Sequence, residues 1–154
     1  QSKDMNDAHQ DLSIAFEILY LNQELKKQTK SILSNVNLKS IDEYSFLLHL
    51  NHQDSFRKME LIHIHLLEAP SGIEVIKRLL KKDFIEEFDD KEDKRAKRVR
   101  ITEKGRLETE RLTPNMKQVY SKMTAEMSFK EKTHVISFLR ELNDYHSTPK
   151  DKRK

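Results

Sequence analysis

The segment at residues 84–106, FIEEFDDKEDKRAKRVRITEKGR, constrains the fold more than any other part of the chain. It begins apolar, passes through a turn-prone acidic stretch, and then carries eight Lys or Arg against three acidic residues over positions 91–106. Val99 and Ile101 alternate with two arginines, which is the pattern of a half-buried strand. The segment therefore predicts a basic β-hairpin between two helices, a feature that usually meets phosphate.

The composition localises this positive charge. The chain has 154 residues, enough for one domain, and a net charge of only +3. The body must therefore be acidic, which points to a local anionic partner at the hairpin. The absence of Cys excludes a disulfide framework or a thiol nucleophile. No apolar run is long enough for a membrane span, and no signal peptide precedes the first helix, so we expect a cytoplasmic protein.

Apolar spacing predicts long helices at both ends of the chain. Residues 11–34 carry two apolar rows, one of them containing Phe16, so this helix should have partners besides its own core. A kinked helix is expected from residue 103 to about 127, because Pro114 falls inside it. A last helix, ending near residue 145, should begin at the capping box formed by Ser128 and Glu131.

Three shorter helices are expected between these ends. The first should run to about residue 51 with Ser40 and Glu43 as its capping box. The second should cover residues 56–67, with Asp54 or Ser55 as cap and Met59, Ile62 (or His63) and Leu66 facing inward. The third, at residues 70–82, should open on Pro70 and carry an apolar face opposite a mostly basic one. Two helices joined by a short turn and followed by a hairpin are typical of a winged helix-turn-helix reader of DNA.

The hairpin resembles the wing signature of MarR-type (multiple antibiotic resistance regulator) transcription factors. That signature has Asp and Arg separated by one residue, then five residues, Leu-Thr, and a Gly three further on. Here these positions are Asp93, Arg95, Ile101-Thr102 and Gly105, with Ile in place of Leu. The order of helices also fits, so the resemblance covers residues 8–146. It departs at Asp83, where the family commonly has Gly, although an Asp can also adopt the left-handed conformation.

The resemblance implies a mode of DNA binding. The helix at residues 70–82 would enter the major groove and the wing at residues 86–101 the minor groove, with Arg95 inserted and Asp93 orienting its guanidinium. Glu74 could accept from a cytosine or pair with a neighbouring cation. The predicted DNA-binding residues are Ser71, Glu74, Lys77, Arg78, Lys81, Asp93, Lys94, Arg95, Lys97 and Arg98.

The family resemblance also implies a homodimer built from helices of both termini. The predicted organisation is a dimerisation helix at residues 1–34, a DNA-binding domain at 35–106, dimerisation helices at 107–146 and a disordered tail at 147–154. Small phenolic or lipophilic effectors bind between these parts in the family. In this chain such a crevice would be lined by Phe16, Tyr20, Tyr44 and Phe46, although core packing is an alternative for each.

The sequence thus predicts a mostly α fold with a small β-hairpin wing. It predicts a dimeric, sequence-specific, ligand-responsive repressor that reads a palindromic site in double-stranded DNA. The alternatives are a winged-helix module that binds protein and an architectural protein that binds DNA without sequence preference. No catalytic constellation or cofactor motif is present, so an enzyme is not expected. The histidines lack a metal-binding pattern, and surface or satisfied histidines are the default interpretation.

Overall fold

The computed structural model describes the backbone of residues 2–145 and the side chains of residues 5–145. It divides into two compact units, Gln1–Val119 and Tyr120–Lys154. The predicted disordered tail at residues 147–154 lies outside the described residues.

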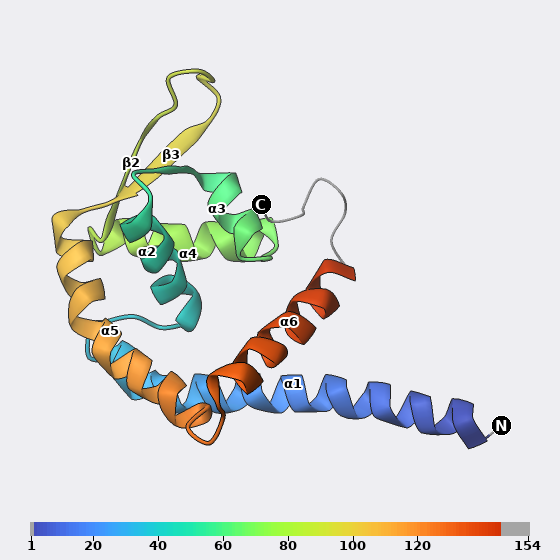
Figure 1. The fold of residues 1–154 in the computed structure, drawn as a ribbon. Coiled ribbons are helices and arrows are strands. Elements are labelled where there is room, and N and C mark those ends of the chain that lie inside the picture. The colour runs from blue at the N-terminus through green and yellow to red at the C-terminus, as the bar shows by residue number, and fades with distance from the viewer. Residues whose placement is uncertain (1, 146–154) are drawn as a thin grey trace. The chain divides into compact units, whose positions relative to one another are not determined.

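The first unit combines helices with a small sheet (Figure 1). It contains α1 (Ser2–Ser34), α2 (Ile41–His52), β1 (Phe56–Arg57), α3 (Lys58–Ile64), α4 (Ala69–Lys81), β2 (Ile85–Asp89), β3 (Lys97–Ile101) and most of α5 (Glu103–Met123). The second unit contains the end of α5 and all of α6 (Phe129–Tyr145). The predicted fold class, mostly helical with a small β-hairpin, is confirmed.

The sheet has three antiparallel strands in the order β1–β3–β2. Ile85 lies opposite Ile101 in the hairpin, as the alternating pattern predicted. The strand β1 was not predicted, because it consists of two residues and forms only by pairing Phe56 with Val99, far away in the sequence. The prediction of a helix starting at residue 56 is therefore wrong.

The helix that follows β1 is shorter than predicted. Its N-cap is Arg57 and not Asp54 or Ser55, because the preceding residues are drawn into the sheet. It ends at Ile64, and Leu66 then adopts a left-handed conformation with φ 57° and lies exposed. Met59 is also 55% exposed instead of facing inward.

The other predicted signals for helix ends are confirmed. Ser40 is the N-cap of α2, and its Oγ accepts the backbone N–H of Glu43 at 3.4 Å. Pro70 lies in the first turn of α4, where a backbone N–H has no acceptor within the helix, so the lack of an N–H in Pro costs no helical hydrogen bond. Asp83 follows α4 with φ 59°, the left-handed position that usually favours Gly. Helix α1 starts at Ser2, well before the predicted residue 11.

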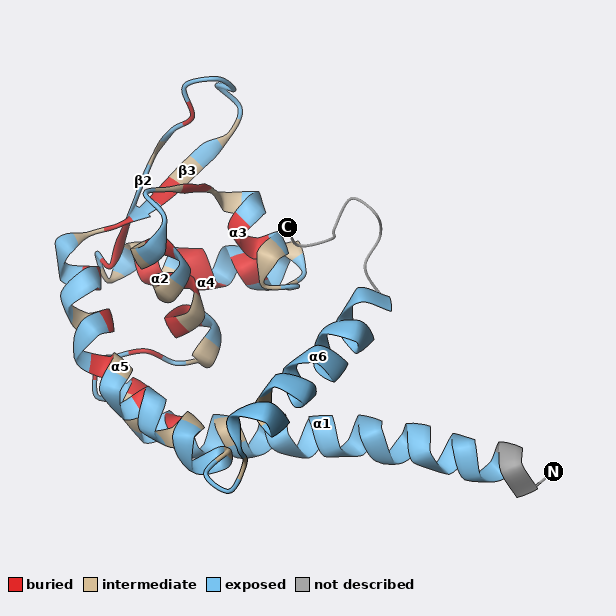
Figure 2. Ribbon diagram, in the orientation of Figure 1, coloured by how far each residue is buried: buried red, intermediate tan, exposed pale blue. Residues whose placement is uncertain are grey.

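The hydrophobic core lies where α2, α3 and α4 pack with the sheet and with α5 (Figure 2). Its most buried members, with no exposed surface, are Phe46, Leu47, Leu61, Leu79, Val99 and Met116. Each such side chain contributes roughly 1.5–3 kcal/mol to folding by leaving water. This core fixes α4 and the hairpin relative to each other.

Helices α1 and α6 differ from this core. None of the described residues of α6 is buried, and Phe138 is 64% exposed. In α1 every described residue before Leu25 is exposed, including Leu19 at 55% (Figure 2). Both helices thus present apolar side chains that the described chain leaves open to solvent.

Candidate nucleic-acid interface

Helix α4 offers an outward face that is free of the core. Gly72, Val75, Ile76 and Leu79 face inward, whereas Ser71, Ile73, Glu74, Lys77 and Lys81 are exposed. A Cβ on Gly72 would lie 2.4 Å from Ile62 Cγ2, so a larger residue could not pack α4 this closely against α3. Gly72 therefore has a packing role in α4.

The acidic residue on this face already has a partner. Glu74 Oε1 lies 3.6 Å from Lys77 Nζ one helical turn away, and both side chains are more than half exposed. The pairing that the sequence left as an alternative for Glu74 is therefore present. Lys81 has no carboxylate within ion-pair distance among the described residues, so its charge is available to an outside anion.

Arg78 and Lys82 are turned away from the outward face toward the buried side chain of Glu43. The Glu43 carboxylate has no exposed surface, and it accepts Arg78 Nε and Lys82 Nζ, each at 2.9 Å. It also accepts the backbone N–H of Lys39 at 3.2 Å. A buried carboxylate without such partners would be strongly destabilising. Arg78, predicted to contact DNA, therefore has a structural role that joins α4 to α2.

The tip of the hairpin is an ordered turn built on Asp93. Its Oδ1 accepts the backbone N–H of Arg95 at 2.9 Å, and its carbonyl accepts the N–H of Ala96 at 3.0 Å. No ion pair joins the Asp93 carboxylate to the Arg95 guanidinium in the described part of the chain. The expectation that Asp93 orients the guanidinium directly is thus corrected: it fixes the backbone from which Arg95 extends. Arg95 and Lys94 are exposed and have no carboxylate partner among the described residues.

The strands beside this tip partly neutralise their own charge. Lys97 pairs with Asp89 across the hairpin, and this hydrogen bond and the attraction between the charges raise the pKa of Lys97. Arg100 pairs with Glu86 and lies over the Phe88 ring, 4.6 Å from its centroid. The positive charge read from the sequence is therefore concentrated at the tip, because β2 supplies acidic partners along the strands.

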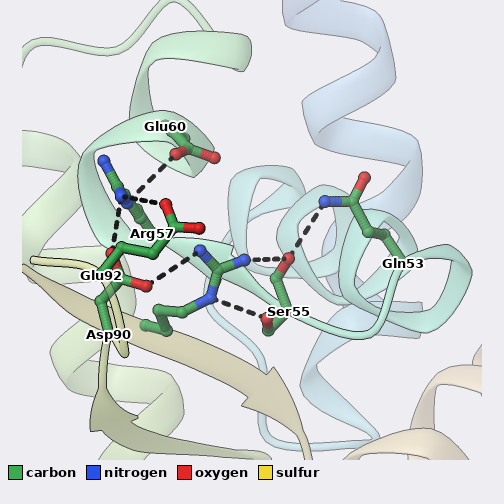
Figure 3. Close-up of polar contacts among 7 residues, drawn as sticks. Gln53, Ser55, Arg57, Glu60, Asp90 and Glu92 are labelled. Carbon is green, nitrogen blue, oxygen red and sulfur yellow. Dashed lines mark hydrogen bonds and ion pairs between the residues drawn. The ribbon is translucent and has the colours of Figure 1, made fainter.

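A network of charged residues, which the sequence analysis missed, anchors the base of this tip (Figure 3). Asp90 is only 7% exposed, and its Oδ2 lies 2.7 Å from Arg57 Nη2, an ion pair that lacks the alignment of a hydrogen bond. Its Oδ1 lies 3.7 Å from Arg98 Nη1. Arg57 and Arg98 are directly opposite each other in β1 and β3, so Asp90 offsets a repulsion between like charges.

Arg98 is further held by Ser55. Its Nε donates to Ser55 Oγ at 2.8 Å and its Nη2 to the Ser55 carbonyl at 3.1 Å (Figure 3). Arg98, predicted to contact DNA, thus has structural partners on the connection before β1. The alternation of charged and apolar residues in β3 predicted which side of the strand Arg98 occupies, but it did not predict the contact with Ser55.

A cavity of about 470 Å³ separates the hairpin tip from α4. Apolar side chains, Met59, Ile73 and Ile76, form part of its wall. The remaining lining is mostly cationic and comes from β1, α3, α4 and the hairpin: Arg57, Lys58, Lys77, Arg95 and Lys97. A concave surface with an apolar floor and cationic edges is suited to a sugar–phosphate backbone.

The four predicted effector residues do not share one environment. Tyr44 and Phe46 are core side chains, 2% and 0% exposed, and the Tyr44 hydroxyl lies 3.0 Å from Thr113 Oγ1. Phe16 and Tyr20 are exposed on α1, where their rings stack with centroids 5.9 Å apart. For Tyr44 and Phe46 the structure supports the alternative of core packing.

Two of the seven histidines, His49 and His65, lie against each other. His49 Nδ1 lies 2.7 Å from His65 Nε2, and the His65 ring packs on Phe46. Within the described residues no group of three or more potential ligands could hold a metal ion. The described helices also include none that is long and apolar enough to cross a membrane.

A family model for the winged helix DNA-binding domain matches residues 25–105, more than half of the chain. The chain belongs to this family. Its members are DNA-binding proteins and not enzymes. No protein of curated function matches the sequence significantly.

Solved structures of MarR-type regulators share this winged helix fold. A MarR family transcriptional regulator from Streptomyces coelicolor in complex with DNA matches with a TM-score of 0.82 at 14% identity, over 92% of this chain and 90% of that one. A mutant of MarR from E. coli complexed with operator DNA gives 0.76 at 16% identity, over 86% and 95%. An organohalide-sensing transcriptional regulator in its 2,4-dichlorophenol bound form gives 0.77 at 20% identity, over 88% and 80%. The predicted resemblance is confirmed in the fold.

The remaining signature residues connect the wing of this winged helix to α5. Thr102 accepts the N–H of Gly105 on its Oγ1 at 3.0 Å, and its own backbone N–H donates to the Phe84 carbonyl at 3.0 Å. A Cβ on Gly105 would lie 2.0 Å from that same carbonyl oxygen, so only Gly fits. These residues set where the wing begins and ends.

Proposed function

We propose that this winged helix protein is a homodimeric, sequence-specific transcriptional regulator of the MarR type, acting in the cytoplasm as a ligand-responsive repressor. In this proposal α4 enters the major groove of a palindromic site, and the wing lies in the adjacent minor groove. The observation that carries the proposal is the set of exposed cations that have no carboxylate partner among the described residues, Lys94 and Arg95 at the wing tip and Lys81 on α4.

Each cation of this set has a defined role in the proposal. Arg95 extends from a turn that Asp93 and the hydrogen bonds of the tip hold in place, so its guanidinium reaches outward at little entropic cost. A guanidinium in this position suits the narrow minor groove of A·T-rich DNA. Lys94 and Lys81 are suited to phosphates on either side. Ser71 and Glu74 remain proposed contacts at the start of α4, whereas Arg78 and Arg98 support the reader from within.

The exposed apolar side chains of α1 and α6 support the homodimer. Phe129 is 88% exposed and Phe138 is 64% exposed on α6, and Leu12 is 53% exposed on α1. Soluble proteins rarely leave such side chains uncovered over whole helices. A second copy would cover them and would also place two readers on one palindrome.

For the effector we propose a small phenolic or lipophilic compound in contact with Phe16 and Tyr20. These are the predicted effector residues whose rings are accessible, and they stack on each other. Titration of the protein–DNA complex with 2,4-dichlorophenol should release the DNA, and the double variant Phe16→Ala, Tyr20→Ala should resist release. Equal release from both proteins would contradict these contacts.

The function is tested by selecting duplexes from a randomised pool with the full chain. We expect enrichment of an A·T-rich palindrome whose half-sites are about one helical turn apart, bound by two chains. An unselective pool that is still bound would favour the architectural alternative. Absence of any duplex binding at low salt would favour the protein-interaction module.

A further inference from the structure

A second cavity, of about 600 Å³, lies on another flank of α4, at the base of the wing. Its lining comes from the α1–α2 connection, the last turns of α4, and the first turns of α5. Phe84, which precedes β2, and Lys104, which follows β3, both line it. The strands are five residues long, so the wing tip lies roughly 16 Å away at ~3.3 Å per residue. This cavity is therefore distinct from the one between α4 and the tip.

The charge of this cavity is strongly unbalanced. Six cationic side chains line it, against the single carboxylate of Glu108: Lys39, Arg78, Lys81, Lys82, Lys104 and Arg111. Glu43, beneath the lining, neutralises Arg78 and Lys82 in part. Glu108 only approaches Arg111, at 4.0 Å. The cavity thus retains a clear excess of positive charge.

Two of these cations have no internal partner. Lys39 and Lys81 have no carboxylate within ion-pair distance in the described part of the chain, and Lys104 lies over the Phe84 ring, 5.6 Å from its centroid. Gathering like charges in a concave site is unfavourable unless an anion enters. Cavities of a few hundred cubic ångströms are also the usual size for small ligands.

We propose that this cavity, the basal pocket, binds a small polyvalent oxyanion such as a phosphorylated or polycarboxylate metabolite. Lys39 approaches the anion from the α1–α2 connection, and Lys104 and Arg111 approach it from α5, which requires a compact ligand with several charged oxygens. Arg78 and Lys82, already held by Glu43, supply a fixed positive floor. A monovalent anion could satisfy only one of the outer cations and should bind far more weakly.

Isothermal titration of the full chain with pyrophosphate, and separately with citrate, tests the proposal in the absence of DNA. The decisive protein is Lys39→Gln, Arg111→Gln. Its matched control is Lys117→Gln, Lys122→Gln, which removes the same charge from exposed positions of α5 outside the pocket. We expect the pocket variant to bind each anion at least about tenfold more weakly, because it loses charge-assisted hydrogen bonds. The control variant should bind within about twofold of the parent.

Several results would overturn the proposal: no binding of either anion, equal weakening in the two variants, or the same response to potassium chloride at matched ionic strength. Preference for pyrophosphate or for citrate identifies the source of the oxyanion. Thermal melting shows whether each variant is folded. If the double variant is not, Lys39→Gln alone should still weaken binding by roughly threefold, and unchanged affinity would then overturn the proposal.

Discussion

Two regions of the molecule differ in how far their apolar side chains are buried: the segment from α2 to the start of α5, and the two helices α1 and α6. In the first region Leu47 and Leu79 have no exposed surface. In the helices Leu19 is 55% exposed and Phe138 is 64% exposed, although the apolar spacing is as regular. Apolar side chains at helical spacing are thus buried within the chain in the first region and exposed to solvent in the second.

The charged side chains of the first region follow the same principle. Glu43 and Asp90 are buried. Glu43 on α2 holds two cations at the end of α4, and Asp90 holds one cation from β1 and one from β3. Such contacts fix one arrangement of α4 and the wing, because a partner lost from a buried site is costly. The outer helices carry no buried charged group among the described residues.

The largest effect is expected from charges placed on the open face of α6. The double variant Phe138→Asp, Leu142→Asp should raise the dimer dissociation constant roughly a thousandfold, about 4 kcal/mol, because two carboxylates would be buried without partners. Analytical ultracentrifugation measures this, with Arg140→Asp on the opposite side of α6 as control. Unchanged mass in the double variant would show that α6 is not covered by a second copy.

The next effect concerns the buried carboxylate between α2 and α4. Glu43→Ala should lower the free energy of unfolding by about 3 kcal/mol, because Arg78 and Lys82 lose a shared partner. The estimate is at the low end of the usual range because the Arg78 side chain is 31% exposed and can regain water. Urea denaturation measures the change. The control is Glu74→Ala, which breaks the exposed ion pair with Lys77 on α4 and should lower the free energy of unfolding by under about 0.5 kcal/mol.

A smaller effect is expected at the base of the wing. Asp90→Ala should destabilise the protein by about 2 kcal/mol, since it removes the buried carboxylate shared by Arg57 and Arg98 and leaves Arg57 only its longer ion pairs with Glu60 and Glu92. Hydrogen exchange of the β3 amides should rise at the same time. Asp89→Ala, one residue earlier and exposed, should leave exchange in β3 nearly unchanged. Similar exchange in both variants would mean that Asp90 does not anchor the wing.

The regions also differ in how far the sequence predicted them. Local signals worked where the cause is local: Ser40 caps α2, Pro70 opens α4, and the alternation around Val99 defines β3. Asp83 in the left-handed conformation was likewise foreseen as a substitute for Gly.

The failures have a common physical origin in tertiary contacts. The strand β1 exists only because Phe56 meets Val99, and no spacing within two residues could reveal it. The carboxylate partners of Arg78 and Arg98 were also missed, because composition cannot tell an outward cation from one held by a distant carboxylate. The Asp93 carboxylate accepts the backbone N–H of Arg95, whereas the sequence predicted a contact with the Arg95 guanidinium.

The smallest effect is a pH dependence at the start of α6. The backbone N–H and hydroxyl of Ser128 lower the pKa of Glu131 from 4.5. The ionised form is therefore favoured in the folded helix, and its stabilising contribution is present above pH 4.5 and lost as the pH falls through the lowered pKa. Far-ultraviolet circular dichroism of the parent should show a small loss of helix in that range. Ser128→Ala should shift the pKa of Glu131 upward, and an unshifted titration by nuclear magnetic resonance would contradict the capping box.

We propose that the wing tip binds DNA through Arg95, while the neighbouring Arg98 and Arg57 support the fold. The most direct test of this proposal is the salt dependence of binding to the selected duplex. Arg95→Ala should weaken binding and flatten the plot of log affinity against log salt concentration by about 0.9, the loss of one cation–phosphate or groove contact. Lys117→Ala, on the exposed side of α5, should keep the parental slope. Equal slope and affinity for the parent and Arg95→Ala would contradict the account.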